Sequence, residues 1–116
     1  MGEMIQVTRK SPMVFVVEQQ PFDYTPATVY GELVFMGSER LAPNAPNAPD
    51  TWNKTVLHSL RREISAYVPG YDYVVPTGAP SRMLVVGMLL AEKGRCHKML
   101  GWDNRQRRYL EYIINI

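Results

Sequence analysis

The feature that most constrains the fold is a short apolar run near the start of the chain. Met13–Val17 is continuous and rich in β-branched residues, and a second apolar run occupies Glu32–Met36. Continuous runs of this length are typical of strands that are buried on both faces. Such strands belong to sheets that helices cover, so the two runs favour an α/β fold.

Two helices are expected between the later strands. Asp50 can cap the first helix, and Pro69-Gly70 ends it. Its apolar face consists of side chains at three- to four-residue spacing: Trp52, Val56, Leu57, Leu60, Ile64 and Tyr67. The second helix runs from about Ser81 to Lys93, directly after Pro80. It is apolar almost all round, so we expect that it either packs beneath other elements or forms part of a dimer contact.

Three further strands complete the expected order, which is β-β-α-β-α-β-β. They cover 72–75, 96–102 and 109–116. Strand–helix–strand units join parallel strands by right-handed crossovers. The sequence therefore predicts one α/β domain over residues 1–116, a two- or three-layer sandwich. Its sheet is largely parallel, has about five strands and ends in an antiparallel C-terminal hairpin. We expect a loose N-terminal arm over 1–11 and a long Pro-rich surface loop over 37–50.

The composition limits the cellular compartment and the binding partners that we expect. The only cysteine, Cys96, excludes an intrachain disulfide framework. No signal-peptide pattern is visible, and no apolar run approaches the roughly 20 residues of a membrane span. We therefore expect a cytoplasmic protein without a membrane partner. The net charge of +2 is too small to indicate nucleic acid, although six basic and two acidic side chains leave +4 over residues 93–116.

The turn between the third strand and the second helix is the best candidate ligand site. It lies at the carboxyl end of a predicted parallel strand, where ligands collect in open α/β sheets. The free N–H groups of a helix start favour an anion such as phosphate. Thr77 and Ser81 would add hydroxyl groups, Arg82 a guanidinium, and Gly78 would let a ligand approach the backbone. The alternative is an ordinary Gly/Pro connection with a capping hydroxyl.

A second candidate follows the first strand. Asp23 could bind a ribose hydroxyl or an amine, and Tyr24 could stack on a base. If the first and third strands are parallel, both loops lie at one rim of the sheet. The alternative is an Asx-type turn that only fixes the loop.

The remaining titratable groups do not form a catalytic or metal-binding motif. His58, His97 and Cys96 lack partners at the spacing of a triad or a metal site, so we expect structural roles for them. We expect no metal and no cofactor, and a binding protein rather than an enzyme. The C-terminal hairpin mixes aromatic and basic side chains as single-strand nucleic-acid binders do. These are Tyr109, Tyr112, Arg105, Arg107 and Arg108.

Two segments resemble a known group of proteins. One reads Asp23-Tyr24-Thr25-Pro26-Ala27, then Tyr30-Gly31 and Leu33-Val34-Phe35; the other reads Asp72-Tyr73, then Thr77-Gly78, Trp102-Asp103 and Tyr109. Together they resemble short uncharacterised proteins of tailed phages and prophages, over roughly residues 13–112. The resemblance implies a phage accessory protein in the bacterial cytosol that modulates a host system, for example by sequestering a nucleotide signal. It implies no catalytic residue.

Three functional hypotheses follow. The first is a protein that binds a phosphate-bearing small ligand or nucleotide at Thr77, Gly78, Ser81 and Arg82, with Asp23 and Tyr24 nearby. The second is a protein-interaction module. It would bind a host protein or a second copy of the chain through the edge strand or the apolar second helix. The third is direct nucleic-acid binding by the basic hairpin, which we consider less favoured.

Overall fold

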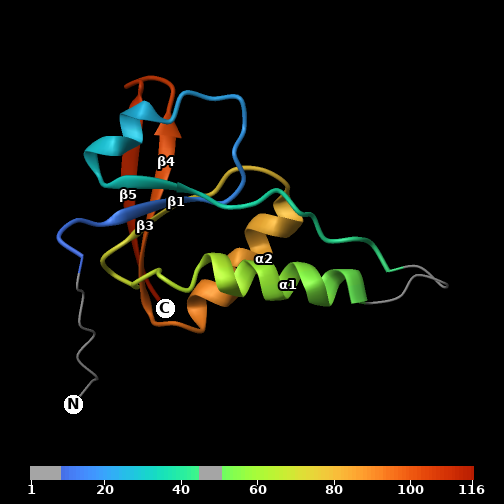
Figure 1. The fold of residues 1–116 in the computed structure, drawn as a ribbon. Coiled ribbons are helices and arrows are strands. Elements are labelled where there is room, and N and C mark those ends of the chain that lie inside the picture. Colours follow the sequence, from blue (N-terminus) through green and yellow to red (C-terminus); the bar gives the residue numbers. More distant parts are fainter. Residues whose placement is uncertain (1–8, 45–50) are drawn as a thin grey trace, which may run out of the picture.

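The computed structural model describes residues 9–44 and 51–116 and shows one five-stranded sheet with helices (Figure 1). The strands are β1 (Met13–Val16), β2 (Glu32–Phe35), β3 (Tyr73–Val75), β4 (Cys96–Asp103) and β5 (Arg108–Asn115). The helices are the 3-10 helix η1 (Thr25–Val29) and the α-helices α1 (Thr51–Glu63) and α2 (Pro80–Ala91). The predicted fold class and element order are confirmed.

The strand order is β2-β1-β3-β4-β5. β1 is parallel to both β2 and β3, β3 is parallel to β4, and β5 is antiparallel to β4. The chain leaves β1 toward β2 on one side and leaves β3 toward β4 on the other. The carboxyl ends of the neighbouring strands β1 and β3 therefore form a topological switch point, the usual place of a ligand in an open α/β sheet.

Both α-helices lie on the same face of the sheet (Figure 1). Their crossovers run in the same direction across the sheet, and right-handed crossovers in one direction place their helices on one face. The connection from β1 to β2 runs the other way, so η1 lies on the opposite face. Tyr30, at the end of η1, donates a hydrogen bond to the carbonyl of Tyr109 on β5 at 3.1 Å.

The two faces of β1 explain its continuous apolar sequence. Phe15 and Val17 point into the core beneath α1 and α2, with Leu60 and Val86 from the helices. The alternate residues belong to a second core on the η1 face, which has these members: Val14, Val16, Tyr24, Ala27, Tyr73, Val75, Leu100 and Tyr109. A strand between two cores has no solvent-facing side and so needs no polar alternation.

The boundaries of several elements differ from the predicted ones. The apolar spacing extends the predicted first helix to Tyr67, but α1 ends at Glu63 and Tyr67 packs into the core from the turn that follows. The 3-10 helix η1 was not predicted, because its five residues are too few to show a periodicity. Asp50 and most of the tandem Asn-Ala-Pro segment lie outside the described residues. The described part of the predicted Pro-rich loop, 37–44, has no regular secondary structure.

Only Arg9 to Ser11 of the predicted loose arm are described, and Arg9 is fixed to the protein. Its guanidinium donates to both carboxylate oxygens of the fully buried Asp72, at 2.8 and 2.6 Å. The same carboxylate accepts the backbone N–H groups of Met13 and Val68. Asp72 therefore joins the start of β1 to the chain segment that enters β3.

Candidate functional site

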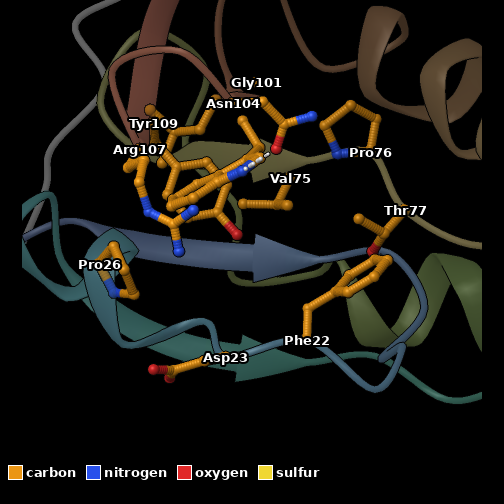
Figure 2. A pocket seen from close by; sticks show the side chains of 12 residues that line it. Phe22, Asp23, Pro26, Val75, Pro76, Thr77, Gly101, Asn104, Arg107 and Tyr109 are labelled. Carbon is orange, nitrogen blue, oxygen red and sulfur yellow. Dashed lines mark hydrogen bonds between the residues drawn. The ribbon is translucent and has the colours of Figure 1, made fainter.

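A cavity of ≈ 780 Å³ opens at the carboxyl ends of β1, β3 and β4, at the switch point of the sheet (Figure 2). Three chain segments form its wall: the loop after β1, the end of β3, and the tip of the β4–β5 hairpin. The lining residues are Phe22, Asp23, Pro26, Val75, Pro76, Thr77, Leu100, Gly101, Trp102, Asn104, Arg107 and Tyr109. Its size lies within the range of small-molecule pockets, roughly 300–1,000 Å³.

The hairpin tip reaches the cavity because β4 is longer than β3. β3 pairs with β4 only at Lys98 and Met99, whereas β4 continues to Asp103 beside β5. The hairpin therefore projects past the carboxyl edge of β3 and rises beside η1 (Figure 1). This projection turns the rim of the sheet into a walled cavity.

Aromatic side chains form much of the wall. Trp102 meets Tyr109 edge to face, with ring centroids 5.1 Å apart, and its indole N–H donates to the Asn104 side chain at 2.9 Å. Phe22 contributes a third ring from the other side of the cavity and is largely exposed. Burial raises the pKa of the Tyr109 phenol, which stays protonated at neutral pH. These rings offer a planar ligand apolar and stacking contacts.

Arg107 supplies the positive charge of the cavity. It sits in the hairpin turn, where its N–H donates to the carbonyl of Asp103 at 2.8 Å. Its φ of 53° lies in the left-handed region, which a residue other than glycine seldom adopts. Figure 2 shows its guanidinium at the end of the cavity that also holds Pro26, with Phe22 at the other end. A guanidinium in this position can donate two hydrogen bonds to a phosphate or carboxylate.

The two predicted loops do meet at one rim, because β1 and β3 are parallel and both Asp23 and Thr77 line the cavity. The Asp23 carboxylate also accepts the backbone N–H of Thr25 at 3.0 Å, as in an Asx turn, and its hydrogen bonds to Thr25 lower its pKa. Tyr24 does not line the cavity. Its ring is buried against Phe35, and its hydroxyl accepts the backbone N–H of Gln20.

The start of α2 already holds an anion, the carboxylate of Glu18. Glu18 Oε1 accepts the backbone N–H of Ala79 at 2.9 Å, and Oε2 accepts from the Arg40 guanidinium at 2.9 Å. The bond to the Ala79 amide, reinforced by Arg40, lowers the pKa of Glu18 despite its burial. A Cβ on Gly78, which has φ +107°, would overlap the Glu18 side chain. Glycine is therefore required at 78 to seat this carboxylate, rather than to admit a ligand.

Arg82 and Ser81 lie away from the cavity. The Arg82 side chain is fully buried and donates to the carbonyls of Val17 and Glu39 at 3.0 and 2.5 Å. It also bonds to the Glu63 carboxylate at 3.4 Å. Ser81 is exposed on the first turn of α2. Of the six predicted site residues, the structure thus brings Asp23 and Thr77 to the cavity; Tyr24, Gly78, Ser81 and Arg82 lie outside its lining.

Five residues that line the cavity were not predicted as part of the ligand site: Phe22, Trp102, Asn104, Arg107 and Tyr109. The sequence pattern assigned Arg107 and Tyr109 to a basic, aromatic hairpin of the kind that binds nucleic acid. One signal could have placed them correctly. A strand that follows a right-handed crossover ends at the same rim as its parallel neighbours, so the turn after β4 had to lie near the turns after β1 and β3.

The fold and the cavity define a class: an open, mostly parallel α/β protein with a small-molecule-sized pocket at its switch point. Within the described residues, no three His, Cys, Asp or Glu side chains gather as a metal-binding group, and no helix is both long and apolar enough to cross a membrane.

The chain belongs to the Phage Pam3 gp32-like protein family, whose match covers residues 12–116. It is therefore a phage protein, as the resemblance implied; the residue pattern quoted for that resemblance remains a prediction. Comparison with the curated proteins and with the solved structures gave no significant match.

Proposed function

We propose that this phage protein binds a small phosphate-bearing ligand, of the nucleotide type, in the cavity at the switch point. The observation that carries the proposal is the pairing of Arg107 with the rings of Phe22, Trp102 and Tyr109 around one ≈ 780 Å³ space. A nucleotide has a phosphate anion that can bind the guanidinium and a planar base that can pack against the aromatic rings.

Each end of such a ligand has a counterpart. The phosphate would accept hydrogen bonds from Arg107, and the base would extend from there toward Phe22, at the end nearer Thr77. The Asp23 carboxylate at the rim would accept from a ribose hydroxyl. The phosphate would thus sit at the hairpin tip and not at the start of α2, because Glu18 occupies that position.

The backbone of Arg107 supports this assignment. A left-handed conformation costs a non-glycine residue about 1–2 kcal/mol. Glycine would adopt the same turn without this cost. Strained backbone positions of this kind cluster at functional sites, where the side chain has a role that offsets the cost. The side chain of Arg107 lines the cavity, which is consistent with a role in ligand binding. Binding would allow the phage to withhold a nucleotide from a host system.

The test is a thermal-shift and calorimetry screen with mononucleotides, cyclic nucleotides and inorganic phosphate. Ligand at 100 times its Kd should stabilise the protein by about 2.7 kcal/mol. Arg107→Gly should abolish the shift while keeping or raising the stability of the free protein, and Trp102→Ala should weaken it. Arg105→Ala is the matched control, since Arg105 is an exposed hairpin arginine outside the cavity.

Unchanged melting with every compound, and no small molecule co-purifying by mass spectrometry, would refute the proposal. Binding only of single-stranded oligonucleotides, with steep salt dependence, would instead favour the nucleic-acid hypothesis.

A second function, protein interaction, is favoured by a separate observation. Six of the large apolar side chains with high exposure lie on α2 and on the chain from β5 to its end: Leu84, Met88, Tyr112, Ile113, Ile114 and Ile116. β5 is also the last strand of the sheet, so its outer edge offers unpaired backbone groups to a host protein. Ile113→Lys should abolish capture of such a partner and leave nucleotide binding unchanged.

A further inference from the structure

The cavity at the switch point offers a ligand one positive and one negative charge. Among its lining residues, all of which belong to the described segments of the chain, only Asp23 and Arg107 are charged at neutral pH. Hydrogen bonds to Thr25 lower the pKa of Asp23, so its carboxylate is ionised. The phenol of Tyr109 stays protonated, because burial raises its pKa. The charges of the lining therefore balance before a ligand binds.

We propose that the cavity takes ligands with a single phosphate group, namely nucleoside monophosphates and cyclic mononucleotides, and discriminates against di- and triphosphates. This inference rests on the proposed function and specifies its substrate class. The Arg107 guanidinium can form two parallel hydrogen bonds with the oxygens of one phosphate. Each further phosphate adds negative charge that meets no second cation in the described lining and is repelled by Asp23.

The end of the cavity at Thr77 presents a hydrogen-bond acceptor. The Thr77 hydroxyl donates its proton to the carbonyl of Glu18 at 2.7 Å, so its lone pairs are what a ligand meets. Ionised phosphate oxygens only accept hydrogen bonds, whereas an amino or ring N–H group of a base can donate to Thr77. The base therefore suits this end, and the phosphate suits the end at Arg107 (Figure 2).

Two arginines near the start of α2 are bonded to other groups of the protein. The guanidinium of Arg40 donates to the Glu18 carboxylate at 3.1 and 2.9 Å. Arg82 is fully buried and donates to two backbone carbonyls. The backbone N–H of Ala79 is also held by Glu18. A polyphosphate that extended toward α2 would therefore have to break bonds that the fold already uses.

The other arginines of the β4–β5 hairpin lie outside the lining of the cavity. Side chains alternate between the two faces of a strand, and Tyr109 lines the cavity, so Arg108 points to the opposite face of β5. The Nε of Arg108 also donates to the side chain of Gln106 at 2.8 Å. Arg105 is exposed in the turn. A polyphosphate held by Arg107 would therefore extend into water, where an ion pair with an exposed arginine contributes little.

Isothermal titration calorimetry with matched phosphates of each common ribonucleoside tests the selection. The titrants are the monophosphate, the cyclic monophosphate, the diphosphate and the triphosphate, in buffer without divalent cations. For the preferred base, we expect the better of the first two to bind at least about tenfold more tightly than the triphosphate. A smaller preference, or tighter binding of the triphosphate, would overturn this inference and leave the proposed function standing. If no nucleotide of any length binds, both fall.

A second positive charge in the wall should weaken the discrimination. Asn104 lines the cavity, where its side chain accepts the indole N–H of Trp102 at 2.9 Å. Asn104→Lys should raise the affinity for the triphosphate, relative to the monophosphate, by about tenfold. Gln106→Lys is the matched control, because it adds the same charge to an exposed residue of the same turn outside the lining, and the ratio should stay unchanged. An unchanged ratio in Asn104→Lys, or an equal change in both variants, would overturn the inference.

Discussion

The carboxylate of Glu18, two residues after β1, accepts a hydrogen bond from the backbone N–H of Ala79, at the start of α2, at 2.9 Å. The two residues are separated by 61 positions in the sequence. The protein thus uses its own side chain as the anion that a helix start attracts. This contact joins β1, the β3–α2 turn and, through Arg40, the segment after β2.

Glu18→Gln should lower the free energy of unfolding at pH 7 by about 1.5–3 kcal/mol, because a hydrogen-bonded charge is lost. The folded protein holds the pKa of Glu18 below its ordinary value of 4.5. The stabilisation is therefore present above about pH 4.5 and is lost as the pH falls through the folded-state pKa.

Urea denaturation of both proteins at pH 7 and at pH 3 measures this effect. The difference between Glu18→Gln and the natural chain should shrink at the lower pH. The exposed Glu32, replaced by Gln, serves as the control and should change the stability by less than about 0.5 kcal/mol. A deficit for Glu18→Gln that does not depend on pH would contradict the assignment.

Arg82→Met should destabilise the protein by about 3–5 kcal/mol, because it leaves the Glu63 carboxylate and two carbonyls without their buried donor. Arg82→Lys should not restore the stability, since one ammonium cannot reproduce three divergent contacts. Chemical denaturation checks both variants. If Arg82→Met proved stable but failed to bind nucleotide, Arg82 would belong to the ligand site after all.

Asp72→Asn should cost about 3–5 kcal/mol, because the carboxylate accepts four N–H donors and the amide would turn its own N–H groups toward them. Arg9→Ala should cost less, since the backbone donors of Met13 and Val68 remain. Denaturant midpoints of the two variants test this order. Equal stability of Asp72→Asn and the natural chain would contradict it.

Tyr67→Phe should lower the stability by about 1–3 kcal/mol. His97 Nε2 lies 2.8 Å from the carbonyl of Gly94, which can only accept, so Nδ1 accepts the Tyr67 hydroxyl at 2.7 Å. Removing the hydroxyl leaves a buried acceptor unsatisfied. Thermal denaturation measures this loss. Tyr112→Phe, which removes a hydroxyl from an exposed ring on β5, is the control and should leave the stability nearly unchanged. Identical melting of the two variants would argue against the bond.

The sequence predicted what depends on local patterns. Continuous apolar runs marked β1 and β2, and Pro80 marked the first residue of α2, since each signal lies within a few residues. The roles of Glu18 and Arg82 depend on partners far along the chain, which no local pattern reveals. The guanidinium of Arg82 is of the kind that binds phosphate. In the structure it donates instead to the carbonyls of Val17 and Glu39, so Arg82 has a structural role.

The antiparallel course of β5 has a practical consequence. The strand passes the cavity at Tyr109 and carries the chain to the opposite end of the sheet, where the backbone N–H of Ile116 donates to the carbonyl of Arg95. A fluorophore or affinity handle attached after Ile116 would leave the cavity at the switch point open for ligand titrations. The same handle would stand next to an apolar groove between α2 and the β4–β5 hairpin, so measurements of protein interaction call for cleaved, untagged protein.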